Sequence, residues 1–290
     1  MKPPPFDYAV PASIEEAVSL LEGYQGEAKV LAGGQSLMAL LNMRLARPGL
    51  LVDVARIGGL DFIRPQGECL AIGAMTRQRS VELSAEVAEL HPLVRAATCE
   101  IAHPQNRNQG TVGGSIAHSD PAAEYPALAL ALEAEMIAVS PAGERSIKAE
   151  DFFVTYLTTA LEPCELLTEI RFPLLGPGTG WSFKEVARRR GDFAMAGVVA
   201  TMTKDEGGRI SEPRVVLFGV GATPLRARQA EAVIEGERPG EPLFAEAATK
   251  AADSIEDPTA DVHAPAQYRL DLARVLVARA LEEACLRAAA

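Results

Sequence analysis

Two similar double-glycine segments constrain the fold of this chain more than any other feature of its sequence. The first is Ala32-Gly33-Gly34-Gln35-Ser36-Leu37 and the second is Gly110-Thr111-Val112-Gly113-Gly114-Ser115-Ile116-Ala117. Glycine reaches positive φ angles and lets backbone N–H groups approach a ligand without an intervening Cβ. Consecutive N–H groups in such a turn bind anions, and the start of a helix after the first segment adds to that effect. The pair therefore predicts two loops that grip a diphosphate from both sides.

A glycine pair at the end of a strand is often only a turn, and a chain can also bind phosphate through other sequence motifs. The sequence has no G-x-x-x-x-G-K-[ST] motif. Gly219-Val220-Gly221-Ala222-Thr223-Pro224 begins like a dinucleotide fingerprint, but Pro224 stands where the third glycine belongs. Two matching loops in one chain favour the ligand interpretation over two unrelated turns.

The net charge of the chain is negative and repels an anionic ligand, so such a ligand has to be bound by backbone N–H groups. The 290 residues include 28 Lys and Arg against 39 Asp and Glu, a net charge of −11. The densest basic cluster is Arg188–Arg190, which could meet an acidic partner or lie on the surface. Nucleic-acid binding is not expected, because it requires an extended basic face.

Targeting and cysteine patterns point to the cytoplasm. The N-terminal residues lack the apolar stretch of a secretory signal, and no apolar run is long enough to span a membrane. The cysteines at positions 69, 99, 164 and 285 form no C-x-x-C pair. This spacing argues against a disulfide framework, a zinc site or an iron–sulfur cluster held by this chain alone.

The periodicity predicts an α+β chain with two domains. A strand at 29–32, a helix at 36–45 and a strand at 50–54 favour a small parallel sheet. A mixed region follows, with helices at 81–90, 92–101 and 121–132. The glycine- and proline-rich end of 171–180 is interpreted as a domain boundary. Three strands (181–188, 194–203 and 214–220) and three helices (225–235, 243–254 and 266–288) then predict an antiparallel sheet with a helical cover.

The two glycine segments, the second extended through His118-Ser119-Asp120-Pro121, resemble the paired FAD signature of the carbon monoxide dehydrogenase medium subunit and its relatives. These are the flavoprotein subunits of the xanthine dehydrogenase family. The resemblance covers essentially the whole chain, including Phe6-Asp7-Tyr8, the stretch 221–227 and Tyr268-Arg269. It implies an FAD-binding domain over 1–175, with lobes of about 1–56 and 57–175, followed by a C-terminal α+β flavoprotein domain over 176–290.

The resemblance also assigns residues to FAD. It places Asp120 near the ribose or adenosine end and Lys184 near the carbonyl edge of the flavin. It places Phe193 beside the isoalloxazine, where relatives often have Tyr, and Ser115 where many have Asn. The full set of expected cofactor contacts is Lys29, Val30, Leu31, Ala32, Gly33, Gly34, Gln35, Ser36, Leu37, Ile101, Gly110, Thr111, Gly113, Gly114, Ser115, Ala117, Asp120, Leu166, Lys184 and Phe193.

No catalytic residue and no metal ligand is expected in this chain. His103 and His118 flank the second loop without a carboxylate or cysteine at metal spacing, so a structural role is favoured for both. Arg107 lies close enough in sequence to reach a phosphate, and a solvated loop arginine is an equal alternative.

By resemblance, the chain is the electron-transfer subunit of a molybdenum hydroxylase. It would take electrons from a small subunit with two [2Fe–2S] clusters, next to a molybdenum-containing large subunit, in a dimer of heterotrimers. The alternatives are a self-contained FAD-dependent oxidase or reductase on a related fold and a non-catalytic nucleotide-binding module. The resemblance lies in the FAD machinery, so it selects neither the substrate (carbon monoxide, an N-heterocycle or an aldehyde) nor the acceptor (a quinone, a cytochrome, NAD or oxygen).

Overall fold

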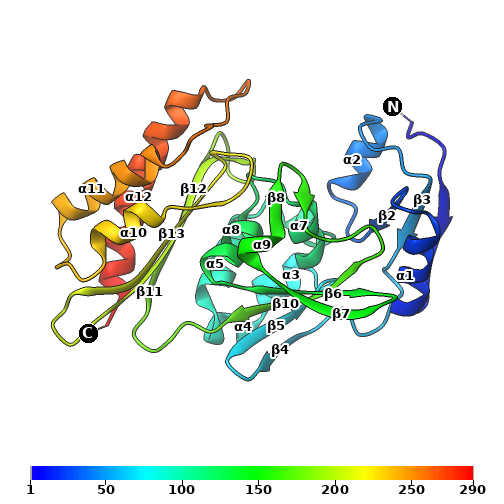
Figure 1. Ribbon diagram of the computed structural model, residues 1–290, viewed down its shortest axis with the longest axis horizontal. Coiled ribbons are helices and arrows are strands. Elements are labelled where there is room, and N and C mark those ends of the chain that lie inside the picture. The colour runs from blue at the N-terminus through cyan, green and yellow to red at the C-terminus, as the bar shows by residue number, and fades with distance from the viewer. Residues whose placement is uncertain (1, 290) are drawn as a thin grey trace.

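The computed structural model describes residues 2–289 and has three consecutive structural units along the chain (Figure 1). The first is an N-terminal lobe with a three-stranded sheet in the order β1-β3-β2, and both strand pairings are parallel. The Ser13 hydroxyl accepts from the Glu16 N–H and begins α1, as the capping-box spacing predicts. The elements of this lobe are β1 (Asp7–Ala9), α1 (Ile14–Gly23), β2 (Ala28–Leu31), α2 (Leu37–Asn42) and β3 (Leu50–Asp53).

The second lobe contains a five-stranded antiparallel sheet in the order β4-β5-β10-β6-β7. Its strands are β4 (Ile63–Gln66), β5 (Cys69–Gly73), β6 (Glu135–Ser140), β7 (Gly143–Lys148) and β10 (Leu166–Pro173), with a small hairpin of β8 (Phe153–Thr155) and β9 (Thr158–Thr159). Its helices are α3 (Gln78–Leu83), α4 (Ala85–Leu90), α5 (Pro92–Glu100), α6 (Pro104–Arg107), α7 (Val112–His118), α8 (Glu124–Ala131) and α9 (Ala149–Phe152).

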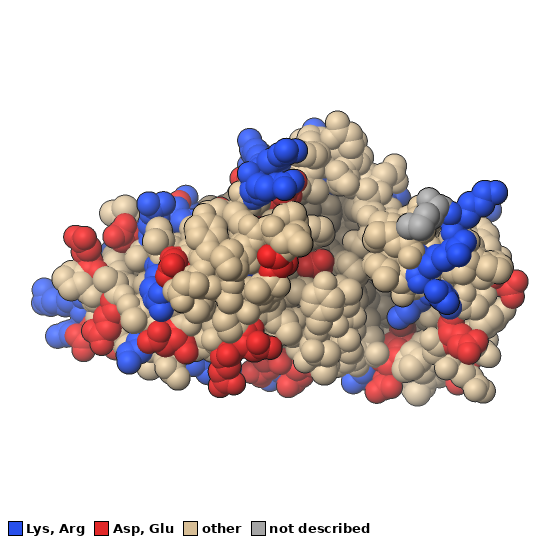
Figure 2. Space-filling view, turned by 90° about the horizontal axis from the view of Figure 1, so that it is seen from above, with Lys and Arg blue, Asp and Glu red and all other residues tan. Residues whose placement is uncertain are grey.

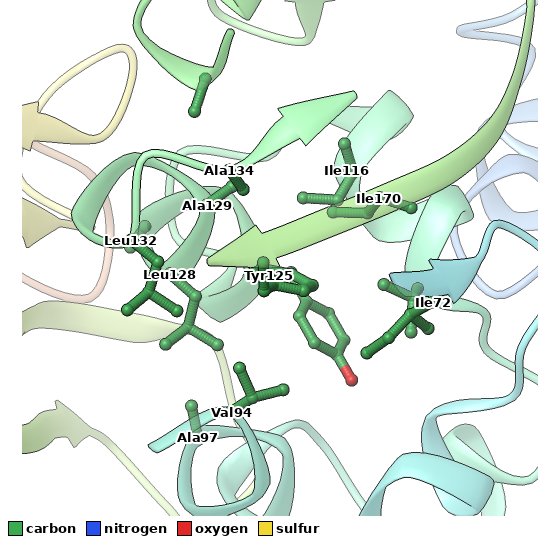
Figure 3. Close-up of a cluster of buried hydrophobic side chains, with 14 of the residues drawn as sticks. Ile72, Val94, Ala97, Ile116, Tyr125, Leu128, Ala129, Leu132, Ala134 and Ile170 are labelled. Carbon is green, nitrogen blue, oxygen red and sulfur yellow. The ribbon is translucent and has the colours of Figure 1, made fainter. Parts of the chain in front are cut away.

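The core of the second lobe forms between its sheet and its helices. Ile72 and Ile170 of the sheet pack with Val94 of α5, Ile116 of α7 and Leu128 of α8 (Figure 3). Tyr125 is fully buried among them, and its hydroxyl lies 2.9 Å from the Thr98 hydroxyl. This core fixes α7, the helix that contains the second glycine pair, against the sheet.

The C-terminal unit is an antiparallel sheet in the order β11-β12-β13-β14 with three helices on one face. Its elements are β11 (Gly180–Ala187), β12 (Ala194–Lys204), β13 (Ile210–Phe218), β14 (Leu225–Arg226), α10 (Arg228–Ile234), α11 (Glu241–Asp253) and α12 (Ala266–Arg287). Val198 and Ala200 of β12 pack under these helices, whereas Val199 belongs to the core of the second lobe. The sheet is therefore covered on both faces, and the second face packs against the second lobe.

The α+β class and the three-stranded C-terminal meander are confirmed, with β14 as an additional short edge strand. The helix expected over 36–45 ends at Asn42, and the short helix α6 was not expected. The helix expected over 81–90 is divided at Ser84, which ends α3 and caps α4. The strand expected over 214–220 begins earlier and includes Pro213. The sheet tolerates this proline because the pairing of β13 with β12 has a bulge opposite the segment between Thr201 and Thr203. The division of the chain near residue 175 stays a proposal, and the irregular connection between β10 and β11 supports it.

Within residues 2–289, no helix is both long and apolar enough to cross a membrane.

Candidate functional site

The structure brings the two glycine loops into direct contact. A Cβ on Gly33 would lie 2.3 Å from the Gln109 carbonyl oxygen and 2.9 Å from the Cα of Gly110. The side-chain amide of Asn106, in the helix α6 that precedes the second loop, donates to the Gln35 side-chain oxygen at 3.2 Å and adds a second contact to the first loop. Segments from different lobes therefore border one site, and Figure 2 shows a shaded furrow between the N-terminal lobe and the rest of the molecule.

The first loop presents free backbone donors. Among the described residues, the N–H groups from Gly33 to Leu37 donate to no protein acceptor. Gly34 has a φ of +70°, a conformation that glycine adopts without strain. A run of unpaired N–H groups at the start of a helix suits an anion, since both the donors and the helix dipole favour negative charge. The first loop fits the diphosphate of FAD.

The second loop uses its glycines differently from the sequence-based expectation. The Gly113 N–H donates to the Ala74 carbonyl at 2.9 Å, and the Gly114 N–H donates to the Thr111 hydroxyl at 3.0 Å. A Cβ on Gly113 would lie 2.5 Å from the Cβ of Ala74. The expectation that this loop offers a second nest of free N–H groups is therefore wrong for both glycines. The lack of a side chain at Gly113 lets α7 lie against the end of β5, which brings the first turn of α7 to the site.

Arg107 is neither a phosphate ligand nor a solvated loop residue in this structure. Its side chain is only 6% exposed and makes a two-point contact with the Glu82 carboxylate, at 2.8 and 3.1 Å. It also donates to the carbonyls of Ile101 at 2.6 Å and Ala102 at 3.0 Å. Ala102 has a φ of +43°, so this arginine holds a strained segment that borders the site. Sequence reasoning missed this role.

A turn from the C-terminal unit reaches the same segment. Gly191, in the connection between β11 and β12, has a φ of +85°, and a Cβ there would lie 2.7 Å from the His103 ring and 3.0 Å from the Ala102 oxygen. Phe193, expected beside the flavin, follows in this turn with its side chain 67% exposed. An exposed aromatic ring at the site border is available to a planar ligand.

Lys184 lies on the other face of the C-terminal sheet. Its ammonium donates to the Glu283 carboxylate of α12, which also accepts from the Ser182 hydroxyl at 2.9 Å. The alternation along β11 points Trp181 and Phe183 toward the second lobe and Lys184 toward α12. A contact between Lys184 and the flavin stays a prediction, and it requires the ammonium to leave Glu283.

The other expected contacts are distributed around the loops. Leu166 begins β10 and is buried in the N-terminal core, and Ile101 is buried at the end of α5. Asp120 is half-buried, and its carboxylate accepts from the Ala122 N–H at 2.9 Å. The remaining ones lead into the first loop, begin α2, precede α7 or lie on α7: Lys29, Val30, Leu31, Ala32, Ser36, Leu37, Gly110, Ser115 and Ala117.

Buried carboxylates gather where β11 meets the second lobe, a feature that no sequence motif signals. Burial first, and then the charges of Glu185, Asp120 and Glu100, together raise the pKa of Glu124 to about 8, against an opposing effect of its own backbone N–H. Burial raises the pKa of Glu185 to about 7, with Glu100 adding to the effect. Glu124 is thus predominantly protonated at neutral pH.

These shifted groups predict a stability that falls as pH rises. At Glu124 and Glu185 the folded chain binds more protons than the unfolded chain between pH 4.5, the ordinary pKa of Glu, and their raised values of about 8 and about 7. Burial lowers the pKa of His91 to about 4, which has the opposite, smaller effect below pH 6.5. Each pKa unit corresponds to about 1.4 kcal/mol, so we expect the unfolding free energy to drop by a few kcal/mol across this window. Glu124→Gln removes a substantial part of the drop, measured by urea unfolding at several pH values. The exposed Glu89→Gln is the control, and an unchanged pH profile in Glu124→Gln would contradict the assignment.

The comparisons with known proteins match the chain over its full length. Residues 4–175 match the family described as the FAD binding domain in molybdopterin dehydrogenase, and residues 181–284 match the CO dehydrogenase flavoprotein C-terminal domain. The chain is 42% identical to 6-hydroxypseudooxynicotine dehydrogenase complex subunit alpha of Paenarthrobacter nicotinovorans, covering 99% of this chain and 97% of that one. It is 39% identical to the carbon monoxide dehydrogenase medium chain of Hydrogenophaga pseudoflava, covering both chains completely.

Solved structures agree with these matches. A chain of carbon monoxide dehydrogenase from Hydrogenophaga pseudoflava superposes with a TM-score of 0.96 at 40% identity, over 100% of both chains. A chain of quinoline 2-oxidoreductase from Pseudomonas putida 86 superposes with a TM-score of 0.93 at 35% identity, over 99% of both chains. Together with the contacting glycine loops, these matches show that the chain belongs to the FAD-binding medium subunits of the molybdenum hydroxylase family, the flavoprotein subunits of oxidoreductases such as carbon monoxide dehydrogenase.

Proposed function

We propose that this chain carries electrons through its FAD from [2Fe–2S] clusters of a small partner subunit to an external acceptor. A large subunit with the molybdenum cofactor would oxidise the substrate, and two such heterotrimers would associate. The observation that carries the proposal is the first glycine loop, whose free N–H donors at the border between two lobes suit the diphosphate of FAD. FAD supplies the ability to accept electrons singly and release them singly or in pairs.

The chain's own contribution is to bind and orient. The segment from Gly33 to Leu37 would hold the diphosphate, and the contact of Gly33 with Gln109 would keep the two lobes in register around it. Arg107 would fix the Ile101–Ala102 backbone beside the ring system. Cys69, Cys99, Cys164 and Cys285 are free thiols, which supports placing the assembly in the reducing cytoplasm.

Co-expression with the two partner subunits tests the proposal. We expect the purified assembly to contain FAD in a ratio of about one per chain, together with iron–sulfur absorbance and molybdenum. Stepwise chemical reduction should then reduce the clusters and the flavin in one connected system, and an added electron acceptor should reoxidise both.

Two results would overturn it. One is an assembly in which the partners co-purify but the flavin site stays empty after FAD is supplied. The other is an isolated chain that binds FAD and turns over an organic substrate by itself, which would favour the self-contained oxidase or reductase.

A further inference from the structure

The segment after the first glycine loop is apolar but poorly covered. Leu41 is the only buried residue of α2, although five of its six residues are apolar, in the sequence LMALLN. Met43 is 50% exposed and Leu45 is 72% exposed in the turn that follows the helix. Large apolar side chains that gather on a surface mark an interaction site more often than chance exposure does.

Basic groups border these apolar side chains. Arg44 and Arg47 are exposed in the same turn, and the Arg44 guanidinium donates to the Lys2 carbonyl at 3.3 Å, which brings the exposed Lys2 alongside. The residues 28–52 include no Asp or Glu, in a chain with 39 acidic residues among 290. Figure 2 shows Lys and Arg side chains gathered on the N-terminal lobe. We call Lys2, Met43, Arg44, Leu45 and Arg47 the α2 surface.

The α2 surface is held in one conformation by backbone bonds. The N–H groups of Leu45 and Ala46 both donate to the Leu40 carbonyl, at 2.9 and 3.3 Å. The Arg47 guanidinium donates to the Arg44 carbonyl at 3.2 Å, and Arg44 has a φ of +59°. A fixed turn presents its side chains at a lower entropic cost than a flexible one, which favours specific docking.

We propose that the α2 surface docks a partner protein subunit whose contact area is apolar at its centre and lined by carboxylates at its rim. Leu45 and Met43 supply the apolar centre on this side, and the cations of Lys2, Arg44 and Arg47 face the partner's carboxylates. The inference rests on the proposed function, since it assigns a docking site to one of the subunits of that assembly. The α2 surface continues directly from the loop that would hold the diphosphate, so a subunit seated there lies next to the flavin site.

A membrane is a less suitable occupant of this surface. Electrostatic binding to anionic lipid typically uses a cluster of about four to eight Lys and Arg residues. The α2 surface has three cations, and its apolar side chains are those of Met43 and Leu45, with no Trp or Phe to insert at the interface.

Charge reversal and apolar truncation on the assembled protein test the docking site. Leu45→Ser and Arg47→Glu are co-expressed with the two partner subunits, with this chain tagged. We expect each variant to retain a partner subunit at least about tenfold less well than the unmodified chain, at an unchanged FAD content. The matched controls are Leu286→Ser, at a position 86% exposed on α12, and Arg238→Glu, at an exposed position after α10. Both should retain the partners fully.

Each of the other outcomes shows a different assumption of the docking proposal to be wrong. Full retention of both partners by Leu45→Ser and Arg47→Glu overturns the docking site and leaves the proposed function intact. Loss of FAD from the isolated variants shows that the surface belongs to the flavin site and overturns the docking proposal. A change in the oligomeric state of the isolated chain assigns the surface to a second copy, and weaker binding to vesicles of anionic lipid assigns it to a membrane. Failure of the unmodified chain to retain any partner overturns the proposed function itself.

Discussion

Gly33→Ala should lower the FAD content of the purified chain by at least about tenfold while the chain remains folded. The new methyl group would lie 2.3 Å from the Gln109 carbonyl oxygen and 2.9 Å from the Gly110 Cα, and both of these are backbone atoms. Overpacking of this kind costs about 1–3 kcal/mol, and the chain relieves it by moving the two glycine loops apart. A cofactor held between the loops then loses part of its contacts, and about 1.4 kcal/mol is a factor of ten in affinity.

The measurement is the ratio of released FAD to protein, with thermal unfolding as the test of folding. Gly58→Ala is the matched control, because its added methyl group would have no atom within 4 Å. Gly34→Ala gives a useful contrast. Its methyl group would meet only side-chain atoms, Met38 Cγ at 3.3 Å and Leu31 Cδ1 at 3.4 Å, so its cost comes mainly from the φ of +70°. A Gly33→Ala chain that keeps its full FAD content would show that contact between the loops does not matter for the cofactor.

Local sequence patterns predicted the elements whose residues lie close together in the chain. The parallel arrangement of β2 and β3 follows from two short apolar strands separated by a helix, and the C-terminal meander follows from strands joined by polar turns. The last helix was predicted over 266–288 and is observed over Ala266–Arg287, because its apolar side chains keep helical spacing throughout.

Contacts between distant segments could not be obtained in this way. The sequence predicts that the glycine pairs are ligand loops, but nothing in either loop reveals that Gly33 touches Gln109, more than seventy positions later. For the same reason the sequence predicts free N–H groups in the second loop. In the structure one of these N–H groups donates to the carbonyl of Ala74, directly after β5, and the other donates to the Thr111 hydroxyl. The raised pKa of Glu124 likewise depends on Glu185, which lies on β11 of the C-terminal unit.

Arg107 is the clearest case of a role that sequence spacing hides. An arginine in a polar segment is solvated in most proteins, and Arg107 is buried only because Glu82 of α3 lies opposite it. The two-point contact with Glu82 and the bonds to the carbonyls of Ile101 and Ala102 satisfy the guanidinium in one geometry. Removing the guanidinium is costly, because the Ile101 and Ala102 carbonyls lose their donor and the largely buried Glu82 carboxylate keeps only its contact with Arg79.

We therefore expect Arg107→Ala to destabilise the chain by about 3–5 kcal/mol and to weaken FAD binding in whatever fraction remains folded. Arg107→Lys keeps the charge but loses the planar two-point contact, so it should recover only part of the stability. Arg79→Ala is the control within the same cluster, because Arg79 also pairs with Glu82 but its side chain is 38% exposed. An exposed partner of this kind contributes about 1 kcal/mol or less.

Urea unfolding across pH adds a second readout to the Arg107 variants. The bond from Arg107 lowers the pKa of Glu82 below its ordinary value of 4.5, so the stability from this pair is present above pH 4.5 and is lost as pH falls through the lowered pKa. In Arg107→Ala that acid-dependent loss should shrink, whereas Arg79→Ala should keep most of it. If Arg107→Ala destabilises no more than Arg79→Ala, the arginine does not hold the Ile101–Ala102 segment, and the flavin border must be fixed by the Gly191 turn against His103 instead.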